Sequence, residues 1–587
     1  MPETKAVSRA PFDISTPTSP RVSTNAAPHQ INIDSSNSDS TLSADIWYVY
    51  DELLDSCNVG RYHIYLLLLC GWANASDAIE IMSASFILPN ATIDLSLTDT
   101  RKGILGGIIF AGMMLGGYIW GTLADKQGRL KCLIGALLLN SFGGILASIS
   151  SSYWILVLCR LVSGLGVGGS VPVLFTYFCE FLPTNKRGQY MVYLAWFWMI
   201  GASITVILAW CIIPIPIEWI LPGNLIIHSW RLFTACCAIP SFICAMLLLT
   251  CPESPRFLLL QGNSAEAIHV LKTIYQVNQR QISMCCHRID PNDDVTDEQL
   301  LDDDDIDTPI DPQQSPFSES MYSMDEESRN KSYQKNNNTV TYDMYITNDF
   351  HTNLKKLHLL LNTTQNELIM NAAKSNNRNA TALTNLRTAI KRTMNLFDST
   401  QRTNSIKLAV VWYFMSFGYY GLTMWIPSYF AAISTDSNSM NEYLSALCNA
   451  LANLPGNIIS VYTVSSYGRR PTLVLSLLLS SVVSLFIPLA GDSISALILV
   501  CVLGTVNVGA WNSINIITTE TYSTHNRSTA YGLMAALGRI GAVTGNLVFA
   551  NFIRVSAGIP LFITAAMFMI ASIAACLLPE TMNKMIQ

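Results

Sequence analysis

Charged residues are scarce in this sequence. Only 13% of the 587 residues are Asp, Glu, Lys or Arg, whereas about 25% is typical of soluble globular proteins. Half of the residues are hydrophobic, and the mean hydropathy is +0.33. The sparse charge and the long apolar runs exclude a soluble enzyme, a disordered chain and a secreted disulfide scaffold. The net charge of −6 provides no basic footprint for nucleic-acid binding.

Motifs for metal binding, phosphate binding and secretion are also missing. The 15 cysteines include no pair with C-x-x-C spacing, and most lie in apolar runs, where cysteine acts as a small hydrophobic residue. Neither H-E-x-x-H nor G-x-x-x-x-G-K-[ST] occurs, so we expect no enzyme, no metal, no cofactor and no direct use of ATP. Residues 1–45 are rich in Ser, Thr and Pro without the apolar core of a signal peptide, which predicts a disordered tail.

Twelve apolar runs are long enough to span a bilayer. A hydrocarbon core of about 30 Å needs about 20 apolar residues in a helix, and only helices or closed barrels satisfy every backbone polar group in lipid. The sequence therefore predicts an all-α membrane protein whose twelve transmembrane helices form two pseudo-symmetric six-helix bundles. The predicted helices lie near 62–86, 103–122, 132–149, 154–176, 189–213, 230–250, 406–431, 442–464, 470–490, 494–517, 528–550 and 556–578.

The predicted domains follow these runs. They are a cytosolic tail and pre-helix segment (1–60), an N-terminal bundle (61–256), a cytosolic central loop (257–405), a C-terminal bundle (406–580) and a short cytosolic C-terminus (581–587). The first half of the central loop is acidic and polar, which predicts disorder. The stretch 352–398 has helical periodicity, with Leu354, Leu357 and Leu361 on one face. Two interpretations stay open for it: an amphipathic helix on the membrane surface, or a solvated helix packed beneath the bundle.

Basic residues set the predicted orientation. Lys and Arg gather in the loops on one face of the membrane, including Arg129, Arg187 and Arg469, and are few in the loops on the other. The positive-inside rule places the first set, both termini and the central loop in the cytosol. The sequon at Asn90 falls in the first outward loop and is the one well-placed candidate for glycosylation.

An internal repeat relates the two halves. Gly128-Arg129 is matched by Gly468-Arg469, 340 positions later, and the pair Glu180 and Arg187 is matched at the same offset by Glu520 and Arg527. Each half also ends in Pro-Glu followed by Ser or Thr. A duplicated six-helix unit is the architecture of secondary transporters that bind a solute at the midplane between the repeats.

Several motifs carry a family resemblance. The stretches GTLADKQGR (121–129) and RLVSGLGVGG (160–169) resemble signatures of the major facilitator superfamily, and PESPR (252–256) resembles its sugar-porter and organic-ion branch. Four further stretches resemble the synaptic vesicle glycoprotein 2 family: FWMIG (197–201), HSWR (228–231), YYGLT (419–423) and LPGN (454–457). The resemblance implies the major facilitator fold, a vesicle membrane and a ligand pocket at Trp198 and Trp511.

The chain departs from that family in two places. Family members carry a large luminal domain between helices 7 and 8, whereas only about ten residues near 432–441 connect them here. In helix 10 the resemblance leads us to expect Trp-Asn-x-x-Asp, but this chain has Asn515 at the last position. One pocket carboxylate is therefore an amide.

Two acids and several aromatic residues are candidates for a solute site. Asp77 and Glu80 are three residues apart inside helix 1 and so share a helical face. A carboxylate at mid-bilayer is unfavourable by about 2.5–3.5 kcal/mol and normally faces a pathway or a partner. We expect solute recognition or proton coupling there, against the alternative of a helix-packing ion pair. The remaining candidates are Trp198, Tyr419, Tyr420, Trp511 and Asn515, where aromatic side chains suit a cation or a sugar, or simply pack helices.

Charged residues at the cytosolic ends predict a gate. The repeated spacing of acids and bases favours ion pairs across the two halves over charges that only hold the loops inside. The predicted gate consists of Asp125, Arg129, Arg160, Glu180, Arg187, Glu253, Arg469, Glu520 and Arg527. Arg160 lies within helix 4, and Glu80 is a candidate partner for it.

Three functions stay open. The first is a secondary transporter of a small polar solute, an organic cation or a sugar-like molecule, which works by alternating access in a vesicle membrane. The second is a transporter-like vesicle protein whose main role is regulatory, with cytosolic trafficking partners. The third is an organic-cation or sugar porter of the plasma membrane.

Overall fold

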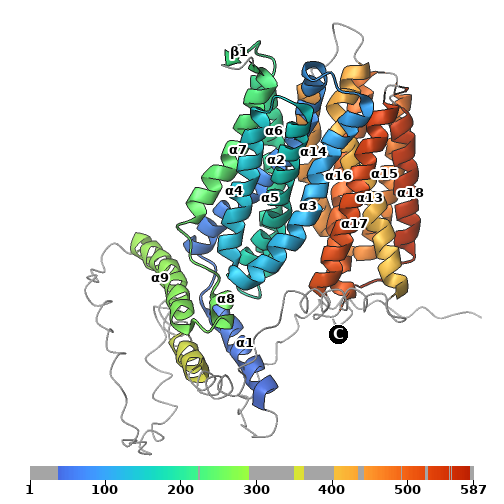
Figure 1. Ribbon diagram of the computed structural model, residues 1–587. Helices are drawn as coiled ribbons and strands as arrows, with labels where there is room; N and C mark the ends of the chain where they lie inside the picture. The colour runs from blue at the N-terminus through green and yellow to red at the C-terminus, as the bar shows by residue number, and fades with distance from the viewer. Residues whose placement is uncertain are drawn as a thin grey trace, which may run out of the picture.

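The computed structural model describes residues 38–221, 225–289, 350–361, 402–433, 442–490, 492–522, 527–553, 555–556 and 558–581. Two helical bundles stand side by side, as Figure 1 shows. The N-terminal bundle consists of α2 (Arg61–Asp94), α3 (Asp99–Gln127), α4 (Arg129–Ser148), α5 (Tyr153–Cys179), α6 (Arg187–Ile212) and α7 (Ser229–Leu248). The C-terminal bundle consists of α13 (Arg402–Ile433), α14 (Glu442–Ser466), α15 (Arg469–Phe486), α16 (Ser493–Thr521), α17 (Arg527–Phe552) and α18 (Ile559–Cys576).

The bundle helices have the length and apolarity that a bilayer requires. Within the described ranges, eleven helices are long and apolar enough to cross a membrane. The exception in the bundles is α13, which is 32 residues long but carries several Trp and Tyr residues that reduce its hydropathy. Because α13 lies inside the C-terminal bundle (Figure 1), each bundle has six helices, and the predicted all-α membrane fold is confirmed.

The two ends of the bundles differ. A small antiparallel hairpin, β1 (Glu218–Leu221) and β2 (Leu225–His228), joins α6 to α7 at one end, which we call the hairpin side. The helices α1 (Ser38–Ser56), α8 (Pro255–Leu260) and α9 (Ser264–Ile289) lie at the opposite end, the α9 side. The α9 side is the one predicted to face the cytosol.

Two expectations of disorder are wrong in part. Helix α1 begins at Ser38, within the predicted disordered tail, and α9 occupies the start of the central loop. Both helices bury apolar side chains beneath the N-terminal bundle, including Leu53, Leu54 and Leu271, and this burial stabilises them. The rest of the predicted tail, residues 1–37, lies outside the described residues.

The periodic stretch of the central loop packs beneath the bundle. Residues 350–361 are helical, Leu357 is fully buried, and the ring of Phe350 stacks on Tyr275 of α9 at 3.9 Å. These contacts favour the packed helix over a helix lying on the membrane. Residues 362–398 of this predicted stretch lie outside the described part of the chain.

The internal repeat extends to the caps of equivalent helices. The Glu253 carboxylate accepts hydrogen bonds from the backbone N–H groups of Arg129 (2.9 Å) and Leu130 (3.0 Å) at the start of α4. Glu580 does the same for Arg469 (3.2 Å) and Arg470 (3.1 Å) at the start of α15. A carboxylate there satisfies amide groups that the helix leaves free and complements the helix dipole. Gly128 and Gly468 precede these helices with φ of +109° and +101°, which glycine adopts without strain.

Glycines set the spacing of α3 and α5. A Cβ atom on Gly116 would lie 2.1 Å from the carbonyl oxygen of Leu165, and one on Gly168 would lie 2.2 Å from that of Met113. The two helices therefore approach backbone to backbone, as small residues allow within membranes. This close pairing places the glycine-rich motif of α5 in the core of the N-terminal bundle.

We predict that Gly116→Ala destabilises the protein, because the new methyl group meets backbone that cannot rotate away. The expected loss is roughly 1–3 kcal/mol in the free energy of unfolding, measured by thermal or denaturant unfolding in detergent. Gly121→Ala on the same helix is the control, since its Cβ would meet nothing within 4 Å. Equal stability of the two variants would contradict the close packing of α3 on α5.

Candidate functional site

The two bundles touch each other along the hairpin side. The hydroxyl of Thr100 on α3 donates to Asn551 Oδ1 on α17 (3.3 Å). A Cβ on Gly103 would lie 2.9 Å from the Cβ of Ala550, and Phe86 of α2 stacks on Tyr443 of α14 with ring centroids 6.1 Å apart. The contact extends inward to Phe110, whose ring centroid lies 4.7 Å from that of Tyr420 on α13.

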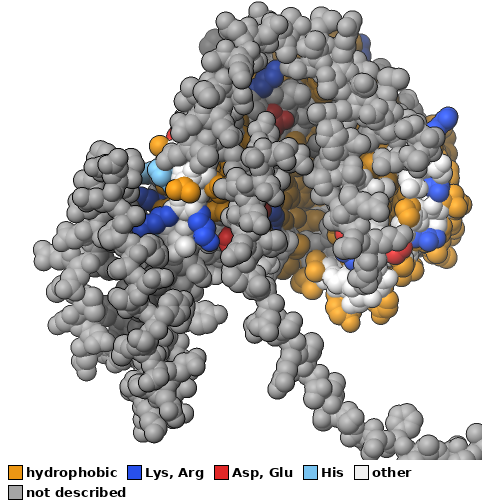
Figure 2. Space-filling view, turned by 90° about the horizontal axis from the view of Figure 1, so that it is seen from below, with side chains coloured by type: hydrophobic (Ala, Val, Ile, Leu, Met, Phe, Trp, Pro, Cys, Tyr) orange, Lys and Arg blue, Asp and Glu red, His pale blue; other side chains and the backbone are white. Residues whose placement is uncertain are grey.

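The same face of α3 is open on the α9 side. About two to four turns beyond Phe110, Tyr118 is 56% exposed, Gly121 has open space where a Cβ would lie, and the Asp125 side chain is 78% exposed. Gly532, on the matching face of α17, is open as well. Figure 2, which views this end, shows hydrophobic side chains between the two halves where the described residues are in view. The bundles are therefore in contact on the hairpin side and apart on the α9 side.

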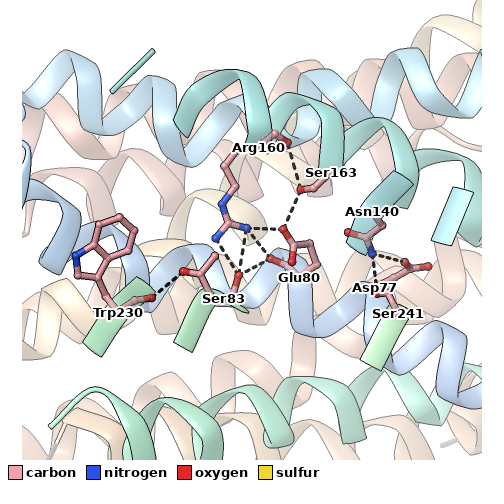
Figure 3. A network of polar contacts seen from close by, with 9 residues as sticks. Asp77, Glu80, Ser83, Asn140, Arg160, Ser163, Trp230 and Ser241 are labelled. Atoms are coloured by element: carbon pink, nitrogen blue, oxygen red, sulfur yellow. Dashed lines mark hydrogen bonds and ion pairs between the residues drawn. The ribbon is translucent and has the colours of Figure 1, made fainter. Parts of the chain in front are cut away.

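Asp77 is the centre of a buried polar network. It lies at the middle of α2, fully buried, and accepts hydrogen bonds from Ser170 Oγ of α5 (2.5 Å) and Asn140 Nδ2 of α4 (3.2 Å). Asn140 also donates to Ser241 of α7 (3.1 Å), as Figure 3 shows. Asp77 and Asn140 thus connect four helices of the N-terminal bundle.

Glu80 forms an ion pair one turn further along α2. Its Oε1 lies 2.6 Å from Arg160 Nη1 and accepts from Ser163 Oγ at 2.8 Å (Figure 3). Ser83 is also within hydrogen-bond distance of Arg160, at 3.2 Å. Arg160 and Glu80 are 2% and 1% exposed, so the ion pair is buried within the bundle. Glu80 is the candidate partner that the sequence predicts for Arg160, and the structure pairs the two. Arg160 accordingly belongs to the membrane interior and not to the predicted cytosolic gate.

Aromatic side chains form a separate cluster in the C-terminal bundle. The ring of Trp511 lies 5.6 Å from Tyr419, 5.7 Å from Tyr420 and 5.8 Å from Trp412 by centroid distances. Tyr531 of α17 packs against Trp412, and its hydroxyl donates to Asn515 Oδ1 (3.1 Å). Tyr419, Tyr420, Trp511 and Asn515, predicted from separate helices, are thus brought together.

The structure separates the other predicted pocket residues from this cluster. Asp77 and Glu80 point into the N-terminal bundle and not toward the aromatic residues. Trp198 lies half-buried on α6 of that same bundle, and the described aromatic pairs include no contact between it and the cluster. In this conformation the two acids and the tyrosines therefore form separate groups.

Arg539 is a site residue that the sequence analysis missed. It lies midway along α17, with its guanidinium carbon 5.3 Å from the ring centroid of Tyr420 and 6.0 Å from that of Phe110. Phe110 belongs to the N-terminal bundle and Tyr420 to the C-terminal one, so the guanidinium lies at the junction of the halves. The sequence does contain a signal for Arg539, because it is a single charged residue within the apolar run 528–550. Such a residue is a functional candidate in its own right.

The charges on the α9 side form one cluster per bundle. Arg129 Nε lies 3.4 Å from Glu180 Oε1, and an Nη of the same guanidinium lies 3.5 Å from Asp125. Burial raises the pKa of the Glu180 carboxyl, and the charge of Arg129 opposes that rise. In the C-terminal bundle, Arg469 lies 3.3 Å from Glu520. Every described ion pair on this side stays within its own half. The predicted pairs across the halves were expected to form in one state and to separate in the other, and they stay a prediction.

Three further predictions have different outcomes. Arg187 lies 3.7 Å from Asp51 of α1, so it ties α1 to the N-terminal bundle and does not bridge the halves. The side chain of Arg527 lies outside the described residues.

Asn90 lies in the helical end of α2, where its amide donates to the Phe86 carbonyl (3.1 Å), and its glycosylation stays a prediction. Among the described side chains, no group of three His, Cys, Asp or Glu is arranged to hold a metal ion.

The chain is similar to proteins of one transporter family. The model of the Major Facilitator Superfamily matches residues 70–546 and 414–584. Synaptic vesicle glycoprotein 2B of Homo sapiens is 28% identical over 92% of this chain and 86% of its own length, and synaptic vesicle glycoprotein 2A of Rattus norvegicus is 29% identical over 92% and 80%.

Solved structures match the fold. The xylose transporter XylE from E. coli, in a partially occluded inward-open conformation, aligns with a TM-score of 0.60 and 14% identity, over 89% of this chain and 99% of that one. A crystal structure of a D-xylose–proton symporter aligns with a TM-score of 0.58. At this level of identity, the likeness concerns the fold.

We predict that Glu80→Gln destabilises the protein by about 3–5 kcal/mol, because it leaves the buried Arg160 without a counter-charge. The double variant Glu80→Gln/Arg160→Gln should recover much of that loss, since no unpaired charge remains. Unfolding in detergent measures both, with Asp125→Asn as an exposed control that changes stability by less than about 1 kcal/mol. A Glu80→Gln protein as stable as the wild type would contradict the buried ion pair.

Proposed function

Because this chain belongs to the Major Facilitator Superfamily, we propose that it is a secondary active transporter that moves a small polar solute by alternating access. One observation carries the proposal: the halves touch along the hairpin side, while the same faces of α3 and α17 are open on the α9 side. Such an arrangement exposes a midplane site to one side of the membrane only. No bond-making step is part of the proposed function.

A rocking motion of the two bundles would reverse this access. Gly121 and Gly532 leave room for α3 and α17 to approach on the α9 side. Asp125 lies on the inter-bundle face of α3 and is exposed, so closure would carry it toward the start of α17, whose dipole favours negative charge. In this proposal the two charge clusters are halves of a gate that is open in the structure.

The buried acids of α2 are the proposed site of proton coupling. Protonation of Glu80 would remove the charge that holds Arg160, and protonation of Asp77 would alter its hydrogen bonds to α4 and α5. Either change would shift the packing of α2 against its neighbours. Because α2 also contacts the C-terminal bundle through Phe86 and Tyr443, a shift in α2 would reach the interface between the halves.

The similarity to the synaptic vesicle glycoproteins 2A and 2B supports a vesicle membrane as the proposed location. It also supports a second candidate function, a mainly regulatory vesicle protein. The layer formed by α1, α9 and residues 350–361 beneath one bundle favours that role, since it offers a structured surface on the α9 side for cytosolic partners.

Proteoliposome uptake under an imposed proton gradient tests the transport proposal. We expect gradient-dependent uptake of at least one solute from a panel of sugars and organic ions, and a loss of at least tenfold in Asp77→Asn. The control Lys126→Gln, on the exposed α9 side, should keep the wild-type rate. If folded wild-type protein transports no solute, but removal of residues 1–37 disrupts partner capture, the regulatory function takes its place.

A cross-link between Thr100→Cys and Asn551→Cys should abolish uptake, because these side chains meet across the halves on the hairpin side. A reducing agent should restore the uptake. Each single variant and the wild type, treated with the same oxidant, control for the native cysteines. Undiminished uptake by the fully cross-linked protein would show that this contact need not open during transport.

A further inference from the structure

The ionisable groups within the membrane-spanning helices differ in whether they have partners. Asp77 accepts hydrogen bonds from two residues, and Glu80 is paired with Arg160. Arg539 takes part in no hydrogen bond or ion pair with any described residue; its guanidinium only lies over two aromatic rings. Such contacts with ring faces hold the guanidinium in position and leave the N–H groups at its edge free to donate.

The surroundings of Arg539 offer hydrogen-bond donors and no described acid. From α13 to α18, Glu442 and Glu520 are the only acidic residues within the helices, and both lie at helix ends. Trp511, whose ring packs on Tyr420, has a buried Nε1–H without a hydrogen-bond partner among the described residues. The amide oxygen of Asn515 already accepts from Tyr531. Arg539 and Trp511 thus both offer free N–H donors beside Tyr420.

From this geometry we infer that Arg539 forms a binding site for the carboxylate of an organic anion, whose apolar body contacts Phe110, Tyr420 and Trp511. A guanidinium matches a carboxylate through two parallel N–H···O hydrogen bonds. Tyr420 contacts both the guanidinium and Trp511, so an aromatic or aliphatic body beside the carboxylate would meet ring surface. A cationic solute would be repelled by Arg539, so this site differs from the organic-cation site that the sequence predicts.

The position of the site links binding to the contact between the halves. Phe110 comes from α3, whereas Tyr420 and Arg539 come from α13 and α17. The three groups lie where the inter-bundle contact ends and the open faces begin. A solute whose carboxylate is bound there would contact residues of both bundles. The role of this site in transport rests on the proposed function, but carboxylate binding at Arg539 can be tested without measuring transport.

Equilibrium binding to the purified full-length protein in detergent is the test. The probes are benzoate, benzamide and benzylammonium, which share a ring and differ in charge, together with chloride and phosphate. We expect benzoate to bind at least tenfold more tightly than the neutral and cationic probes. Arg539→Gln should weaken benzoate binding by tenfold or more, and Arg539→Lys should lie between, because lysine keeps the charge but not the bidentate geometry. Trp511→Phe keeps a ring, removes the N–H and should weaken binding several-fold.

Controls separate the outcomes. Lys126→Gln removes one exposed positive charge and should leave benzoate binding unchanged, and melting temperatures verify that each variant is folded. Equal benzoate binding by wild type and Arg539→Gln, tighter binding of benzylammonium, or chloride and phosphate competing as strongly as benzoate would each overturn the inference, as would no binding of benzoate to folded wild type. Arg539-dependent benzoate binding without uptake in proteoliposomes would uphold the site and count against the transport proposal alone.

Discussion

Close approach of α3 and α17 on the hairpin side is the contact on which the arrangement of the two bundles depends. In lipid, apolar side chains gain little by leaving their surroundings, so helices associate through tight packing and hydrogen bonds. Gly103 and Gly106 of α3 allow that approach against Ala550 and Asn546, and Thr100 adds a hydrogen bond to Asn551. Because the contact covers only one end of the two helices, the other end is free to be open.

Within each bundle, packing and polar contacts serve different purposes. The glycines of α3 and α5 bring backbones together and fix the core of the N-terminal bundle. The carboxylates of Glu253 and Glu580 cap the N-termini of the equivalent helices α4 and α15. The two halves therefore share specific side-chain contacts as well as their topology. The acids of α2 differ, since they have no acidic counterparts in α13 and find their partners within their own bundle. The repeat thus supplies the scaffold, and the unrepeated charges are candidates for function.

The sequence predicts the scaffold well because its signals are local and periodic. Apolar runs determine the helices, and the 340-residue offset predicts two bundles with matching caps. Which side chains become partners depends on how each helix is rotated relative to its neighbours. The sequence of one apolar run does not determine that rotation. Asp77 and Glu80 therefore turned out to face inward, the charge clusters stayed within their halves, and α1 and α9 proved helical because their burial beneath the bundle was invisible in composition. Arg539 has no charged counterpart in the repeat, since the residue 340 positions earlier is Met199.

The most direct test of alternating access is the distance between spin labels at positions 121 and 532, measured in lipid nanodiscs by pulsed electron paramagnetic resonance. Both positions face open space between the halves on the α9 side, so labels there can be tolerated. The account predicts two distance populations, a longer one for the open arrangement and a shorter one for the closed arrangement, whose ratio changes with pH or bound solute. One unchanging distance under all of these conditions, in protein shown to be folded, would contradict it.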